Sequence, residues 1–139
     1  MKTIGTDGRD YIIDPNKTSI NENAESKSGL HVKARTVIKK CFPYSKIYEE
    51  VVLLGCNGIG GKPLRADFLI PDMRVIVEVH GQQHYKYTKH FHNSKAGFDT
   101  YIKNDEIKLE WAKINSISCI TLPYDEINTW ENIINGNIG

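Results

Sequence analysis

Hydrophobic positions change their spacing several times along the chain, and each change predicts a new helix or strand. Residues spaced like one face of a helix predict helices over 28–41, 96–115 and from Asp125 onward, with Ser28 and Asp125 as the capping residues of the first and the last. Short β-branched and aliphatic runs predict strands over residues 47–54, 64–70, 74–80 and 117–122. The order α-β-β-β-α-β-α is typical of an α/β sandwich with a mixed sheet.

The N-terminal segment follows neither spacing. Residues 1–26 are rich in Asn, Asp, Ser and Lys, and their apolar cluster is limited to Tyr11, Ile12 and Ile13. This composition predicts a flexible or loosely docked arm ahead of one folded domain over residues 27–139.

Length and cysteine usage narrow the class of protein. The chain has 139 residues, no apolar run near the length of a membrane span, and no apolar core of a secretory signal at its N-terminus. Its three cysteines are odd in number and widely spaced, which argues against a disulfide framework and favours a reducing compartment. We therefore expect a cytoplasmic protein with no membrane partner.

Charge is concentrated in the centre of the chain. Residues 27–113 carry a net charge of +6, whereas residues 1–26 and 114–139 carry −2 and −3. A basic centre suggests a polyanion partner such as DNA, although a solvated lysine-rich surface is the alternative. The candidate DNA-binding residues are basic side chains of the first predicted helix and of a segment interleaved with aromatic residues, namely Lys33, Lys39, His84, Lys86, Lys89, His90, His92 and Lys95.

The histidines in that segment allow a second interpretation. His84, His90 and His92, perhaps with Cys119, form a rival zinc site, but their spacing fits no strong zinc pattern. A surface loop with neither role is the third alternative.

The predicted hairpin over residues 64–80 carries the most informative chemistry. A turn centred near Asp72 places Asp67 opposite Val77 and Glu78, so that two carboxylates meet across adjacent strands. A divalent cation, magnesium above all, would offset that repulsion. Glu78 and His80 share one face of their strand, and His80 could accept a proton from water or orient a phosphate. The alternative is an exposed, charged sheet face without metal.

Asp105 is a second anomaly, because it interrupts the apolar stripe of the helix predicted over residues 96–115. That stripe contains Phe98, Ile102, Leu109 and Ala112. A charge on a packed face is costly unless it is paired or metal-bound. Asp105 therefore belongs either to the same site or to an ion pair with a lysine or histidine.

These residues together resemble a known family. The runs 65–71 (RADFLIP) and 77–85 (VEVHGQQHY) are similar to the PD-(D/E)XK nuclease superfamily, especially its very-short-patch-repair (Vsr) branch and the phage homing endonucleases called EDxHD. Asp67 and Glu78 match the family's acidic pair, and His80-Gly81 stands where Lys is commonest in the superfamily. Asp105 and Lys108 match the Asp-x-x-Lys pattern of the next helix. The resemblance covers about residues 28–134.

The resemblance implies a restriction-endonuclease-like α/β sandwich, with a central mixed sheet flanked by helices, that cuts DNA with Mg²⁺, for which Mn²⁺ can substitute. It implies that Asp67, Glu78 and the Val79 carbonyl ligate the metal and that His80 positions or deprotonates the attacking water. Asp105 and Glu50 would complete the site or orient its histidines.

One departure from the family leaves two candidates open. Relatives commonly have a glutamate in the first helix, where this chain reads Ser28-Gly29-Leu30-His31, so that either His31 or Glu50 supplies the missing group.

Wider expectations follow from the same resemblance. It implies a phage or mobile-element origin, action in the host cytoplasm, and a possible homodimer, because one small domain contacts little DNA. The alternative function is a catalytically inactive DNA-binding or protein-interaction domain that retains the nuclease fold.

Overall fold

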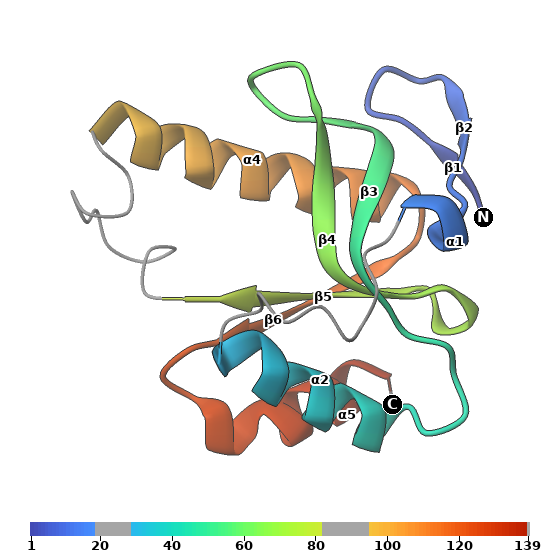
Figure 1. Cartoon of the computed structure of the whole chain (residues 1–139). Coiled ribbons are helices and arrows are strands. Elements are labelled where there is room, and N and C mark those ends of the chain that lie inside the picture. Colours follow the sequence, from blue (N-terminus) through green and yellow to red (C-terminus); the bar gives the residue numbers. More distant parts are fainter. Residues whose placement is uncertain (19–28, 82–94, 139) are drawn as a thin grey trace.

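A four-stranded mixed sheet with helices on both faces forms the body of the protein in the computed structural model, which describes residues 1–18, 29–81 and 95–138 (Figure 1). The elements in chain order are β1 (Lys2–Ile4), β2 (Asp10–Ile12), α1 (Pro15–Thr18), α2 (Gly29–Cys41), β3 (Tyr48–Asn57), β4 (Pro63–Ile70), η1 (Pro71–Met73), β5 (Val75–His80), α4 (Lys95–Ile114), β6 (Ser118–Pro123), η3 (Ile127–Thr129) and α5 (Trp130–Ile138). The predicted α/β class with a mixed sheet is confirmed at this level.

The order of strands across the sheet is β3-β4-β5-β6. Strands β3, β4 and β5 pair antiparallel, as the predicted hairpin requires, whereas β5 and β6 pair parallel. Parallel neighbours need a long crossover, and α4 lies within that connection. The crossover carries α4 over one face of the sheet, opposite the face covered by α2 and α5 (Figure 1).

Each face of the sheet buries its own apolar cluster. On the α2 and α5 side, Phe68, Val77 and Trp130 belong to one cluster, and on the α4 side, Ile76 and Trp111 belong to the other. Alternate residues of a strand point to opposite faces, so Val77 faces α2 and α5 while Ile76 and Glu78 face α4. The acidic residue of β5 therefore lies on the same side of the sheet as α4.

The N-terminal segment differs from the predicted arm. Within residues 1–18, β1 and β2 form an antiparallel hairpin, and Ile13 is fully buried beside α4 and β3. The side-chain amide of Asn115 accepts from the Ile4 N–H at 2.7 Å and donates to the Ile4 carbonyl at 2.9 Å. A buried isoleucine, the bidentate amide of Asn115 and hydrogen bonds from Thr6 to the Gly55 carbonyl therefore help to hold a segment whose composition is that of a loose arm.

Two local expectations at the helices are corrected. Leu109, predicted on the buried stripe of α4, is 51% exposed, because the face of α4 that meets the sheet is rotated toward Lys108 and Trp111. Asp125 does not cap the last helix, since the η3 turn comes first and its N-cap residue, Glu126, makes no side-chain capping bond. The predicted capping residue Ser28 lies outside the described residues.

The helices were also compared with the length and apolarity of a membrane span. In the ranges 1–18, 29–81 and 95–138, no helix is long and apolar enough to cross a bilayer.

Candidate active site

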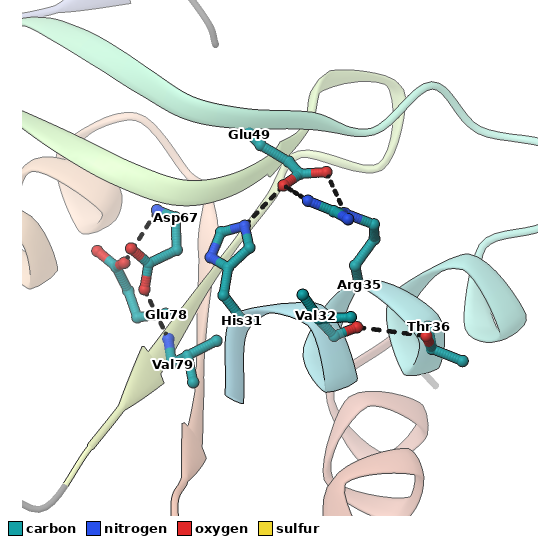
Figure 2. A network of polar contacts seen from close by, with 8 residues as sticks. All are labelled: His31, Val32, Arg35, Thr36, Glu49, Asp67, Glu78 and Val79. Atoms are coloured by element: carbon teal, nitrogen blue, oxygen red, sulfur yellow. Dashed lines mark hydrogen bonds and ion pairs between the residues drawn. The ribbon is translucent and has the colours of Figure 1, made fainter. Parts of the chain in front are cut away.

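Asp67 and Glu78 meet across strands β4 and β5. Phe68 pairs with Val77 in the antiparallel register, which puts Asp67 opposite Glu78. The Asp67 N–H donates to Glu78 Oε2 at 3.1 Å, and the Val79 N–H donates to Asp67 Oδ2 at 2.8 Å (Figure 2). The hairpin thus fixes both carboxylates through backbone hydrogen bonds, as the turn position predicted.

Lys108 brings a positive charge to this pair from helix α4. Its Nζ lies 2.6 Å from Glu78 Oε1, and the two side chains are only 16% and 6% exposed. Sequence reasoning did not predict this ion pair, because 30 residues separate its partners. The helix repeat could have suggested it, since Lys108 follows Asp105 by three residues and shares its side of the helix.

The electrostatics of the pair are set by burial. Burial above all, and then the Glu78 carboxylate, raise the pKa of Asp67 to about 7, although the Val79 N–H and Lys108 act in the opposite direction. Burial works against the charged form of Lys108, but the adjoining Glu78 outweighs it and raises the pKa of the amine above its ordinary value. Near neutral pH the site therefore holds the Lys108–Glu78 ion pair beside Asp67, a carboxyl that is then partly protonated.

Glu50 adjoins the same centre from strand β3. Its neighbours Glu49 and Val51 pair with Phe68 and Ala66, which leaves Glu50 level with Asp67. Its backbone adopts a left-handed conformation with φ of 50°, which non-glycine residues rarely take inside a strand. The Glu50 carboxylate also helps to raise the pKa of Asp67. Of the two candidates for the missing helix glutamate, Glu50 is thus the one beside Asp67.

His31 takes part in a different network on α2. Its Nε2 lies 2.6 Å from Glu49 Oε1, and Arg35 donates to both oxygens of Glu49, from Nε at 2.7 Å and from Nη2 at 2.9 Å. The imidazole stacks on Phe68 with ring centroids 4.5 Å apart. Figure 2 draws the His31 ring between the Asp67–Glu78 pair and the Glu49–Arg35 pair.

Glu49 is the buried centre of that network and is 1% exposed. Burial alone would raise the pKa of Glu49, but the hydrogen bonds from Arg35 and His31 outweigh burial and hold it below its ordinary value. Sequence reasoning missed this role of Glu49. The available signal was the spacing of His31 and Arg35, four residues apart on one face of α2.

His80 and Asp105 both lie beside Glu78. They line a small cavity of about 30 Å³ together with Glu78, Lys108, Leu109, Cys119 and Thr121. The helix thus brings Asp105 to the same face as Glu78, as its place in the apolar stripe indicated. Burial, followed by the charge of Glu78, raises the pKa of the Cys119 thiol to about 12, so this sulfur is a protonated, unreactive wall of the cavity.

The predicted DNA-binding residues divide into two groups. Lys33 and Lys39 on α2 and Lys95 at the start of α4 are exposed. The others lie outside the described residues, and so do the three histidines of the alternative zinc site; they are His84, Lys86, Lys89, His90 and His92. Cys41, Cys56 and Cys119 are free thiols, in agreement with the predicted lack of a disulfide framework.

The donor set was compared with what magnesium needs. Within the described parts of the chain, no three or more His, Cys, Asp or Glu side chains are grouped so that they could hold a metal ion. Magnesium commonly binds one or two carboxylates and completes its shell with waters and substrate phosphate. Asp67 and Glu78 match that smaller requirement, and Asp67 is a carboxyl that a nearby cation would ionise.

No protein-family model matches the chain, and no solved structure matches it. The chain is similar to Uncharacterized protein 307L of Invertebrate iridescent virus 6, with 35% identity over 65 residues. That segment is 47% of this chain and 33% of the viral protein, so the chain spans about a third of that relative, whose name assigns it no activity.

Proposed function

We propose that the chain is a metal-dependent DNA endonuclease with a restriction-endonuclease-like sandwich of the Vsr or EDxHD type. The observation that carries the proposal is the Asp67–Glu78 pair, held by backbone hydrogen bonds on adjacent strands and flanked by His80 and Asp105. The mixed α/β fold and the register of the β4–β5 hairpin are compatible with the family's motif, and both support the proposal.

Different residues of the chain have different roles in the proposed reaction. Asp67 and Glu78 would hold Mg²⁺ or Mn²⁺, with the Val79 carbonyl as a further ligand. When bound, the metal neutralises charge on the scissile phosphate and acidifies a water. His80 orients that water or accepts its proton.

The surrounding residues support these roles. Glu50 and Asp105 supply negative charge around the ligands, and Lys108 fixes the orientation of Glu78. His31 is held by Glu49 and acts on the site only through position.

DNA is the proposed polyanion. The exposed Lys33, Lys39 and Lys95 would meet backbone phosphates, and the basic centre of the sequence supports this role. A homodimer would give the contact area that one small domain lacks. Action in the cytoplasm of a host cell fits a phage or mobile-element origin.

Cleavage of supercoiled plasmid with magnesium, and again with EDTA, tests the proposal. We expect nicking or linearisation with magnesium alone, its loss in Asp67→Asn, and its retention in the control Asp72→Asn, an exposed aspartate of η1. DNA binding by Asp67→Asn should be unchanged or tighter, because a negative charge beside phosphate is removed. Metal-independent cutting, or full activity in Asp67→Asn, would refute the assigned site.

A second candidate is a non-enzymatic DNA-binding or protein-binding domain with the same fold. Two observations favour it: Lys108 already neutralises Glu78, and the described residues contain no ready group of three metal ligands. DNA binding without cleavage, in magnesium and in manganese, would establish this alternative.

A further inference from the structure

Lys108 places a buried ammonium directly on one of the two central carboxylates. The Lys108 amine lies 2.6 Å from Glu78 Oε1, and its side chain is 16% exposed. Burying an amine costs several kcal/mol unless a well-placed anion compensates, so Glu78 and Lys108 depend on each other.

Both carboxylate oxygens of Glu78 already have a hydrogen-bond partner. Oε1 receives the Lys108 amine, and Oε2 accepts the Asp67 N–H at 3.1 Å. Magnesium binds a carboxylate oxygen at roughly 2.0–2.1 Å and keeps several waters. A divalent ion bound to Oε1 would lie close to the Lys108 ammonium, which is 2.6 Å from the same atom, and the two positive charges would repel.

The neighbouring space is too small to resolve that conflict. The cavity beside Glu78, His80 and Asp105 measures about 30 Å³, which accommodates roughly one or two waters rather than a hydrated ion beside the amine. Lys108 is the flexible member of the site, with four carbons between its amine and the helix. Asp105, one turn earlier on α4, lines the same cavity and offers another anion.

We infer that Lys108 is a positioning residue that occupies Glu78 in place of a divalent cation in the metal-free protein, and that the cation displaces its amine. This inference rests on the proposed function. Its consequence is that Lys108 weakens metal binding by the DNA-free protein. A phosphate near Glu78 gives the released ammonium a new partner, so metal and DNA bind cooperatively, each tightening the other by the same factor.

Calorimetric titration of DNA-free protein with Mn²⁺ tests the competition. Lys108→Met keeps the length of the side chain and removes its charge, and Lys103→Met is the matched control, an exposed lysine of the same helix. We expect Lys108→Met to bind Mn²⁺ at least about tenfold more tightly than wild type and Lys103→Met to bind as wild type does. Equal or weaker binding by Lys108→Met overturns the inference.

A second measurement uses the unaltered chain, in case Lys108→Met does not fold. Acetylation of lysines by an activated ester, followed by mass spectrometry, reports how accessible each amine is. We expect Lys108 to react slowly in EDTA and several-fold faster once Mn²⁺ saturates the site, while the rate for Lys103 stays constant. A Lys108 rate that does not rise with bound Mn²⁺ overturns the inference.

Different results would refute the role of Lys108 and the endonuclease activity. If wild type cuts plasmid with magnesium but neither measurement responds as expected, the role of Lys108 is wrong and the endonuclease stands. If no form binds Mn²⁺ and no plasmid is cut, both proposals fall.

Discussion

Replacing Asp67 by asparagine should stabilise the metal-free protein, and the gain should depend on pH. The folded protein holds the Asp67 proton up to a pKa of about 7, whereas the unfolded chain releases it near 3.8. Between these values the folded state binds more protons, so the free energy of unfolding falls as pH rises. Asparagine cannot ionise, and its carbonyl can still accept the Val79 N–H, so the variant should not show this fall.

The magnitude follows from the size of the shift. About three pKa units at about 1.36 kcal/mol each correspond to about 4 kcal/mol lost by wild type between pH 4 and pH 8. For a domain of this size that corresponds to roughly 10–20 °C in melting temperature. Glu49 acts in another window: because its pKa is lowered from 4.5, its stabilisation is complete above that pH and is lost only in more acidic solution.

The assay is thermal unfolding by circular dichroism from pH 5 to pH 8 in EDTA. We expect the Tm of Asp67→Asn to exceed that of wild type increasingly as pH rises, whereas Asp72→Asn, changed at an exposed position, should follow wild type. Magnesium at pH 8 should raise the Tm of wild type more than that of Asp67→Asn. If the curves of wild type and Asp67→Asn stay parallel across the range, the carboxyl is not desolvated as described.

Three further predictions concern the surroundings of the site. Glu49→Gln should lower the free energy of unfolding at pH 7 by about 1.5–3 kcal/mol, measured by urea denaturation, because charge-assisted hydrogen bonds in a buried network are lost; an unchanged midpoint would contradict it. Asn115→Ala should speed amide hydrogen exchange in β1 at least about tenfold, because the Ile4 N–H and carbonyl lose their partner; unchanged protection would show that other contacts hold the hairpin. Cys56 and Cys119, whose thiol pKa values burial raises to about 12, should react with iodoacetamide at pH 8 at least about a hundredfold more slowly than in urea, by mass spectrometry; similar rates would place them at the surface.

The sequence was most informative where structure is local. Strand pairing in a short hairpin follows from the position of its turn, so the meeting of Asp67 and Glu78 could be predicted from spacing alone. The helical spacing of the apolar residues likewise placed Asp105 on the side of α4 that faces the sheet. It wrongly placed Leu109 there too, because an apolar stripe does not show how far a helix is rotated.

Contacts between distant segments were beyond such reasoning. Lys108 reaches Glu78 only because the crossover places α4 over β5, and no periodicity encodes the length of a lysine side chain. The buried position of Glu49 depends on charges from α2, which a strand pattern read alone cannot supply. The N-terminal hairpin was missed for a related reason: it is held by contacts with residues far along the chain, among them Asn115 and Gly55, which local composition does not reveal.

The parallel pairing of β5 with β6 has a consequence for how the chain reaches its native state. The β4–β5 hairpin closes a short loop and can form early, which brings Asp67 and Glu78 together while α4 is still unattached. Lys108 reaches Glu78 only after the crossover has closed, and non-local closure of this kind is slow. A chain that forms this hairpin first would hold two crowded acids without their counter-ion, and protons or dissolved cations would relieve that repulsion. Refolding should accordingly be faster in mildly acidic solution. In this order of assembly, the negative charges of Asp67 and Glu78 gain their counter-ion, Lys108, only at a late step.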